Sequence, residues 1–591
     1  MANGREGGLA SGWFRASAMA AALASFGADG AKPPKPPSSV ARPVEVIKST
    51  EEDDVDGKPG KAASPKLGPS APTVRPGEVD ALIEKGLAAS GTAASPATTD
   101  EEFIRRVYID VLGTLPTPGS IRQFVGSRER DKRALLIDAL LDHPDYATNW
   151  ARYWRDVISY RSPDEDARRI NYDGFTKWLA GQFAANKPWD QIATAIITAT
   201  GRDDENAATA FSVAEEGQAV ELAGEVSRVF MGVQIQCAQC HDHPSDPWKR
   251  QQFHEFAAFF SGVKRRPLPN PGPGLRRGFE IVAKGQAHYT MPDLKDPAKK
   301  VAVSPKFFLG DGPKISEQVP ADERLKLAAG YVASPENPWF ARAFINRTWY
   351  ALMGEGFYTP VDDLGPTRTA NSPEILDLLT DQWRKSGFDV RWLFRTILNT
   401  RAYQRQSRST NTAAGRTPFA ANCPSRLRGD QIFDALAHAL NLDRDPKPAA
   451  RPDPAAKAKA AEKAEKAAPT MMANPVDRRR DEVNHAFGVD PSTPNDDVLG
   501  TIPQALYLMN GPLISREVQA RPNTMLGELL MATNDNRSAL DALYLKVLAR
   551  RPTLREVNTC AHFLGTVGDR REAFEDILWA LLNSTEFVSR R

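Results

Sequence analysis

The segment "EEFIRRVYIDVLGTLP" (Glu101–Pro116) decides the fold, because its apolar residues recur with the period of an α-helix. Phe103, Val107 and Val111 lie four residues apart, and Ile104 lies beside them on the same face. Such an apolar stripe is buried against neighbouring helices. The segment therefore predicts an amphipathic helix inside a helical domain.

The same helical period returns along the chain. It appears in "DKRALLIDALLDHPDYATNW", "AVELAGEVSRVFMGV" (Ala219–Val233), "PEILDLLTDQWRKSG" and "VRWLFRTILNTRAY". Residues 264–320 differ, with a proline-rich stretch and short apolar runs such as "FEIVA" and "KKVAV", which favour loops and short strands. The predicted fold class is mostly α, with two helical domains, a short-strand and loop segment between them, and disordered N-terminal and internal linkers.

Composition places the domain boundaries. Residues 32–77 are rich in Pro, Lys, Ser and Asp, and residues 445–469 are rich in Ala, Lys, Glu and Pro, so both read as solvated linkers. The predicted division is a signal-type segment and tether (1–77), a helical domain with the cysteine motif (78–263), a connection (264–320), a second helical domain (321–445), a low-complexity linker (446–480) and its C-terminal part (481–591).

Part of the chain is repeated. "YIDVLGTLPT" begins at Tyr108 and "YLKVLARRPT" begins at Tyr544, with proline eight residues after each tyrosine. The phrases "DALLDHPDY" and "WALLNSTEF" then close the two copies. Two separated copies are too few for a solenoid, so we interpret them as a packing unit, a helical hairpin of 103–150 that recurs near the C-terminus.

Bulk composition excludes several classes of protein. With 41% hydrophobic and 25% charged residues in 591, the chain resembles ordinary globular protein. A formal charge of +2 gives no general field for nucleic acid or anionic lipid, and no apolar run is long enough to span a bilayer. Four cysteines are too few for a disulfide scaffold.

The N-terminus has two interpretations. Arg15 precedes a weakly apolar, alanine-rich stretch that contains Ala22-Leu23-Ala24, which fits a secretory signal with an A-x-A cleavage site. The alternative is a disordered Ala/Gly tail. The first interpretation predicts a periplasmic or cell-surface location.

The stretch "QIQCAQCHDHPSDPW" (Gln234–Trp248) carries the clearest chemical signal. In a Cys-x-x-Cys-His motif, two cysteines one turn apart can form thioethers to the haem vinyl groups. The following histidine then serves as the proximal iron ligand. The motif predicts one haem c held by Cys237, Cys240 and His241.

A haem also needs an apolar pocket and a sixth ligand. We expect "FHEFAAFF" (Phe253–Phe260) to supply the apolar face. His254, His288 and Met291 are the candidate sixth ligands, with Met231 a weaker one, whereas His243 lies too close to His241 to reach the opposite side of the ring.

Other chemistries use the same atoms. Zinc is the main alternative, with Cys237, Cys240, His241 and His243 as ligands; a redox dithiol or a disulfide are further alternatives. The residues after the motif have two interpretations. They form either a rigid rim whose carboxylates bind a metal or steer a proton or, more simply, a turn that aspartate caps and tryptophan anchors; they are Asp242, Pro244, Asp246, Pro247 and Trp248.

Long phrases of the chain resemble a known pair of domains. "RRVYIDVLGTLPT", "YATNWARYWRDVISY" and "CAQCHDHPSDPWKRQQFHEFAAFF" are similar to a planctomycete-type, cytochrome-c-like domain of unknown function. "NPWFARAFINRTWYALMGEGFYTPVDDLG", "RLRGDQIFDALAHAL" and "TIPQALYLMNGPL" are similar to the domain of unknown function that follows it in planctomycete and related bacterial proteins. The resemblance spans roughly residues 80–591 and implies an exported protein with a haem at Cys237, Cys240 and His241. Relatives often carry an additional upstream cytochrome module with its own Cys-x-x-Cys-His motif, and the sequence here contains one such motif, so we expect at most one c-type haem.

The function expected from this sequence is electron transfer or redox sensing by a single covalent haem, with an unidentified redox partner or surface assembly. One alternative is a non-haem metal enzyme that acts on polysaccharide, whose site residues would be Asp242, His243, Asp246 and the Asp362-Asp363 pair. The other is a structural or interaction protein in which a metal or a disulfide cross-links the end of the helix. The paired aspartates read more simply as helix caps or partners of an arginine such as Arg347. No P-loop, dinucleotide fingerprint or Ser/His/Asp order supports a hydrolase.

Overall fold

The computed structural model describes residues 75–161, 170–269, 277–296, 298–309, 312–408, 417–442, 475–494 and 500–591. The predicted mostly α-helical class is confirmed. The helices of the first half are α2 (Pro76–Ala89), α3 (Asp100–Leu112), α4 (Pro118–Gly126), α5 (Lys132–Leu141), α6 (Pro144–Ser159), α7 (Tyr172–Ala184), α8 (Trp189–Ile197), η2 (Ala207–Thr209), α9 (Ala210–Ala214), α10 (Ala219–Val226), η3 (Ser227–Met231), η4 (Ile235–Ala238), α11 (Arg250–Ala257) and η5 (Ala258–Phe260).

The second half continues the helical pattern. Its helices are α12 (Ala321–Val332), α13 (Phe340–Met353), α14 (Pro373–Lys385), α15 (Val390–Leu398), α16 (Gly429–Leu440), α18 (Pro475–Phe487), α19 (Ile502–Asn510), α20 (Pro512–Glu517), α21 (Met525–Ala532), α22 (Asn536–Val547), α23 (Leu554–Val567) and α24 (Arg570–Leu582).

The strands are short and antiparallel, and those from β2 to β5 lie almost wholly within residues 264–320, as expected. The strands are β1 (Gly201–Arg202), β2 (Val263–Pro267), β3 (Phe279–Ala283), β4 (Thr290–Pro292), β5 (Lys300–Ala302), β6 (Ser425–Arg426) and β7 (Ser589–Arg590). They pair in the orders β1-β3-β2, β4-β5 and β6-β7. The apolar run "FEIVA" forms β3, whose alternate residues are buried.

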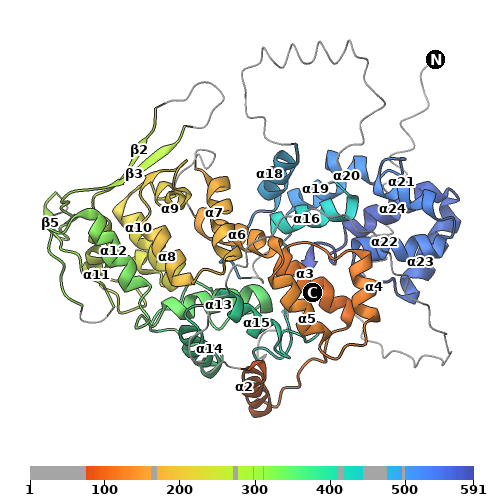
Figure 1. The fold of residues 1–591 in the computed structure, drawn as a ribbon, viewed down its shortest axis with the longest axis horizontal. Helices are drawn as coiled ribbons and strands as arrows, with labels where there is room; N and C mark the ends of the chain where they lie inside the picture. Colours follow the sequence, from red (N-terminus) through yellow and green to blue (C-terminus); the bar gives the residue numbers. More distant parts are fainter. Residues whose placement is uncertain are drawn as a thin grey trace, which may run out of the picture.

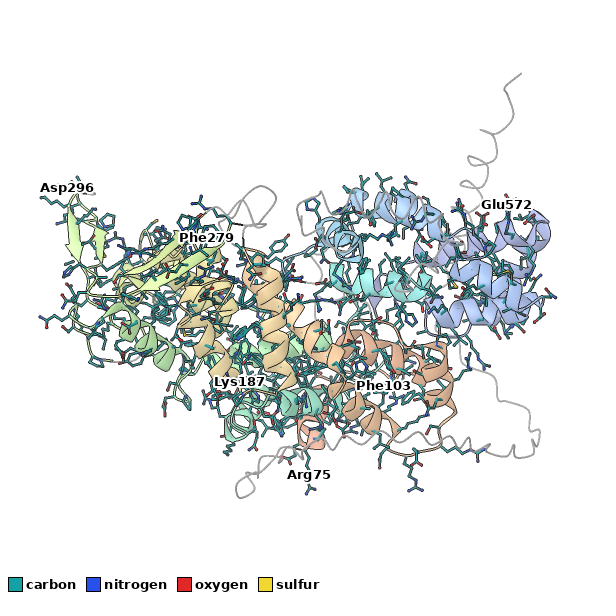
Figure 2. The ribbon with its side chains drawn as sticks, turned by 45° about the horizontal axis from the view of Figure 1, so that its top comes forward. Arg75, Phe103, Lys187, Phe279, Asp296 and Glu572 are labelled. Carbon is teal, nitrogen blue, oxygen red and sulfur yellow. The ribbon has the colours of Figure 1, made fainter. Side chains whose placement is uncertain are left out.

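The molecule is elongated, with the strands β2, β3 and β5 near one end and α21–α24 at the other (Figure 1). Figure 2 shows Asp296 and Glu572 at these opposite ends. The helices α6, α7, α13 and α15 occupy the middle, and α3–α5 lie beside the C-terminal helices (Figure 1).

The two buried cores each combine helices from more than one of the predicted ranges. One core combines apolar residues from Val79 to Ala420 with Leu545 and Ala549, so α12–α15 share it with the helices of 78–263. The second core gathers Leu427 to Phe587 and also takes Ile109 and Leu115 from the first part of the chain. Amphipathic periodicity shows that each helix has a buried face but does not show which helix will cover it.

The repeated hairpins lie side by side. Thr117 and Thr553, which follow the repeated prolines, cap α4 and α23 by accepting hydrogen bonds from Ser120 N and Glu556 N. Helices α4 and α22, one from each copy, are in contact. The repeat is therefore a packing unit whose two copies meet.

Two predicted segments fall mostly or wholly outside the described residues. These are the signal-type segment and tether (1–77) and the linker (446–480), of which the structure describes only the ends. Within the described residues, no helix combines the length and hydropathy that a membrane crossing needs.

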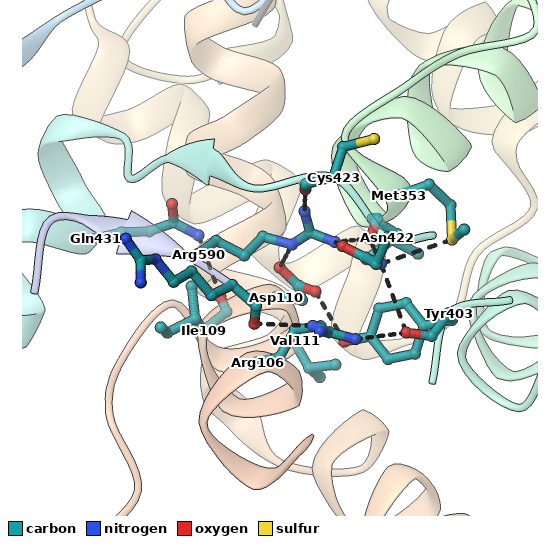
Figure 3. Close-up of polar contacts among 12 residues, drawn as sticks. Arg106, Ile109, Asp110, Val111, Met353, Tyr403, Asn422, Cys423, Gln431 and Arg590 are labelled. Carbon is teal, nitrogen blue, oxygen red and sulfur yellow. Dashed lines mark hydrogen bonds and ion pairs between the residues drawn. The ribbon is translucent and has the colours of Figure 1, made fainter. Parts of the chain in front are cut away.

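A buried arginine network joins α3 to the end of the chain (Figure 3). Arg590 Nε lies 2.7 Å from Asp110 Oδ1, and both side chains are at most 4% exposed. Tyr403 Oη donates a hydrogen bond of 2.7 Å to the other oxygen of Asp110. Arg106 donates to the carbonyls of Tyr403 and Arg591, so α3 holds both the second half of the chain and its last residue.

This network predicts a large effect of Arg590→Ala. The variant leaves Asp110 buried without its cationic partner, so the free energy of unfolding should fall by about 3–5 kcal/mol. Chemical denaturation followed by circular dichroism measures it. Arg555→Ala, at an exposed site on α23, is the matched control, and an equal effect of the two variants would contradict the assignment.

Candidate functional site

The cysteine motif follows a helix that ends against the second half of the chain. Helix α10 continues into η3, a π-helical turn, and stops at Gly232, whose φ is 64°. A Cβ at Gly232 would lie 2.8 Å from Leu364 Cδ1, so this approach requires glycine. Leu364 N donates a hydrogen bond of 2.7 Å to the Gly232 carbonyl, which fixes the start of the motif.

The two thiols are exposed to solvent, Cys237 within the short helix η4 and Cys240 just after it. Ile235 and Ala238 are fully buried and anchor the turn, whereas Cys237 and Cys240 are exposed. Both cysteines are free thiols, not a disulfide. The structure therefore places two accessible thiols one turn apart, as covalent attachment to a common group requires.

His241 is exposed beside Cys240. Its Nδ1 lies 2.7 Å from the carbonyl oxygen of Asp242. Because a carbonyl only accepts, Nδ1 carries the proton in this contact, and the lone pair of Nε2 remains on the other side of the ring. This tautomer and this backbone contact are those of a histidine that binds a metal through Nε2.

The loop after the motif is a capped turn. Asp242 accepts hydrogen bonds from Arg250 N (3.0 Å) and Lys249 Nζ (2.9 Å) at the start of α11, and these contacts lower its pKa. His243 Nδ1 accepts from Asp246 N at 2.9 Å, and its side chain is 7% exposed. Both residues thus have structural partners.

Asp246 connects this loop to the second half of the chain. Its buried carboxylate accepts hydrogen bonds from the backbone N–H and the hydroxyl of Thr367, and Arg368 lies 3.9 Å away. Trp248 is 7% exposed and packs edge-on against Phe308 at 5.3 Å. The geometry is that of an anchored turn.

His254 uses both ring nitrogens inside the fold. Its Nε2 donates to the carbonyl of Gln239 (3.0 Å), within the motif, and its Nδ1 accepts from Tyr289 Oη (2.8 Å). Burial lowers the pKa of His254, which favours this neutral form. His254 therefore braces the cysteine turn and has no free nitrogen for iron.

The other candidate sixth ligands are buried away from the exposed thiols or already contact another side chain. Met291 is buried, with its sulfur 3.6 Å from Arg250 Nη1. Met231 is fully buried, and its sulfur accepts from Asn337 Nδ2 at 3.3 Å. His288 is exposed and lies 2.8 Å from a carboxylate oxygen of Glu317.

The aromatic segment downstream of the motif belongs to the core. Phe253, Phe256, Phe259 and Phe260 are at most 1% exposed, and Phe256 packs on neighbouring aromatic rings. These rings are already covered by protein. The expectation that they form an open apolar face for a haem is therefore not met by this conformation.

A cavity of about 380 Å³ lies beside Cys237 and is lined by charged residues. Glu225 binds Arg228 through both carboxylate oxygens, and Glu221 accepts from Gln236. Glu215 is 1% exposed, and its Oε1 has no hydrogen-bond partner among the described residues. Burial, with the nearby carboxylates of Glu225 and Glu221, raises the pKa of Glu215 to about 9.

Asp362 accepts hydrogen bonds from two residues that line this cavity, Arg228 and Gln234. Its carboxylate is fully buried, 3.3 Å from Arg228 and 3.5 Å from Arg161, with Arg347 at 3.9 Å. Burial opposes ionisation, but the three arginines outweigh it and lower the pKa of Asp362. Asp363 forms an ion pair with Arg368 at 3.0 Å instead, so the two aspartates have different partners and do not form a common site.

Several residues that line the cavity were not among the predicted site residues, although the sequence contains a signal for three of them. The sequence spacing between Glu221 and Glu225 is four residues, and that between Glu225 and Arg228 is three. In an otherwise apolar helix this spacing places the three charges on one face. Glu215 has no such signal, since its burial depends on contacts between distant segments.

The zinc alternative needs four ligands around one point. Within the described residues, no group of three or more His, Cys, Asp or Glu side chains is placed to hold a metal ion. Cys237, Cys240, His241 and His243 are thus not gathered as a set, and His243 Nδ1 is already an acceptor within its own turn.

Comparison with known families agrees with this architecture. Residues 78–265 match PSCyt2, "Protein of unknown function (DUF1549)", and residues 323–564 match PSD1, "Protein of unknown function (DUF1553)". The two matches follow one another along the chain, in the order that the resemblance predicted. No curated protein and no solved structure matches it. The cysteine motif lies in the DUF1549 domain, and Asp362 and Thr367, which brace it, lie in the DUF1553 domain.

The buried Glu215 predicts a pH-dependent stability. Glutamate in the unfolded chain titrates near 4.5, whereas folded Glu215 keeps its proton to about pH 9. Between these values only the unfolded state releases the proton, so stability should fall as pH rises, by at most about 1.4 kcal/mol per pH unit.

Thermal melts at pH 5 to 9 test this expectation. Glu215→Gln should flatten the fall of the melting temperature, and Glu129→Gln, at an exposed site on the surface, should not. Identical slopes for Glu215→Gln and the native chain would show that Glu215 is ionised in the fold.

Proposed function

We propose that this tandem protein carries one covalent haem on Cys237 and Cys240, with His241 as the proximal iron ligand, and that it transfers or senses single electrons. The observation that carries the proposal is the pair of free, exposed thiols one turn apart, next to a histidine whose Nδ1 contacts a backbone carbonyl. A thiol pair buried in the core would not be accessible to a haem.

The residues around the motif fit the proximal half of such a centre. Buried Ile235 and Ala238 fix the turn, and His254 braces it through the Gln239 carbonyl. A haem bound here would supply one-electron chemistry. Because Cys237, Cys240 and His241 are exposed, the protein would offer the group directly to a partner, which suits electron exchange between proteins.

No protein ligand for the sixth position follows from the described residues. His254 and the buried methionine sulfurs have partners of their own, and His288 is paired with Glu317. The cavity beside Cys237 is lined mainly by charged and amide side chains, none of which is an iron ligand of the kinds considered above. We therefore propose that the chain binds the iron on the His241 side alone.

Covalent haem attachment takes place outside the cytoplasm, so the proposal includes export to the periplasm or cell surface. The alanine-rich N-terminal stretch would act as the secretory signal. The partner would be another redox protein or a surface assembly.

A haem stain of denatured, exported protein tests the attachment. The protein should stain after SDS electrophoresis when it is produced in a host with c-type maturation machinery, because thioethers survive denaturation. Cys240→Ala should abolish most of the stain, and Cys560→Ala, which removes a buried thiol elsewhere, should leave it unchanged. Unstained native protein with stoichiometric zinc would contradict the proposal.

Absorption spectra test the ligand assignment. His241→Ala should shift the spectrum while the stain remains, since it removes the proximal imidazole and not the thioethers. Met291→Leu and His288→Gln should leave the spectrum unchanged, because neither side chain is placed as a ligand. A shift in either variant would identify a sixth ligand and overturn this assignment.

A further inference from the structure

A second cavity lies far along the chain from the cysteine motif, between α19, α24 and the β6-β7 pair. Its volume is about 430 Å³, within the range of small-molecule sites. Its walls are mainly apolar and include Leu508, Met509, Trp579 and Val588. Arg426 supplies the one charged side chain among the described residues of this lining.

The position of Arg426 is fixed by the fold. Its backbone pairs with Ser589 in the β6-β7 ladder. Gly500 leaves room for its guanidinium, because a Cβ there would lie 3.0 Å from Arg426 Nη1. The guanidinium thus sits between this cavity and a smaller one of about 110 Å³ that Arg426 also lines.

Arg426 lacks the partner that a half-buried arginine normally has. Within the described parts of the chain, the Arg426 side chain makes no ion pair or hydrogen bond. Burial lowers the pKa of Arg426, and no neighbouring carboxylate raises it again. The carboxylates of the smaller cavity are already neutralised: Asp110 by Arg590 and Asp490 by Arg161, each at 2.7 Å. In the same cavity, the buried Nε of Arg428 has no hydrogen-bond partner among the described residues.

An uncompensated guanidinium at the end of an apolar cavity is complementary to a molecule with one anionic end. We propose that this cavity binds a small organic anion, with its carboxylate or similar oxyanion on Arg426 and its apolar body against Leu508, Met509 and Trp579. A purely apolar ligand would leave the guanidinium unpaired, and an inorganic anion would leave the apolar walls uncovered.

Calorimetric titration of the full chain with octanoate and with 1-octanol tests the site, because the two probes share a chain and differ in charge. One octanoate should bind per chain, more tightly than octanol. Arg426→Gln should weaken octanoate about tenfold or more and leave octanol unchanged, since a charge-assisted contact is lost. Arg555→Gln is the matched control and should change neither.

Ala505→Trp gives a second, independent variant. Ala505 is exposed on α19 and lines the cavity, so a larger side chain fills the cavity without entering the core. It should weaken both probes. If Arg426→Gln does not fold, the preference of the native chain for octanoate and its loss in Ala505→Trp still decide the question. No octanoate binding, no preference over octanol, or equal affinity in a folded Arg426→Gln would overturn the proposal.

Discussion

A buried ion pair between Arg228 and Asp362 holds the helix before the cysteine motif to the loop that covers it. The two charges lie 3.3 Å apart, and neither side chain is more than 5% exposed. Buried charges are tolerated only when they are paired, so separating the two elements would take away one of the arginines that neutralise the fully buried Asp362. Because Arg228 lies in the DUF1549 domain and Asp362 in the DUF1553 domain, the conformation of the motif depends on both.

The same dependence recurs elsewhere in the molecule. Asp246, in the loop after the motif, contacts Thr367, and Arg590 at the end of the chain pairs with Asp110 of α3. The larger hydrophobic core, which runs from Val79 to Ala420 and includes Leu545 and Ala549, also spans the boundary between the two family regions. We infer that the two domains form one structural unit, which gives a physical reason for their occurrence in tandem.

Sequence patterns predicted the helices and short strands because these depend on local periodicity, as Phe103, Val107 and Ile281 illustrate. They did not predict which helices share a core, because that depends on contacts between distant segments. The motif itself was visible in the spacing of its cysteines. The partners of His254 and the burial of Glu215 could not be predicted, because they depend on side chains that are distant in the sequence. A motif does not show whether the nitrogen or carboxylate of one of its residues is already hydrogen-bonded within the fold.

Intact mass spectrometry of the exported protein after denaturation tests the covalent attachment most directly. Thioether bonds at the motif predict a single species that is heavier than the processed polypeptide by one haem, and that reverts to the polypeptide mass when both Cys237 and Cys240 are replaced. The bare polypeptide mass in a host that matures other c-type cytochromes would contradict the attachment, whatever the absorption of the native sample.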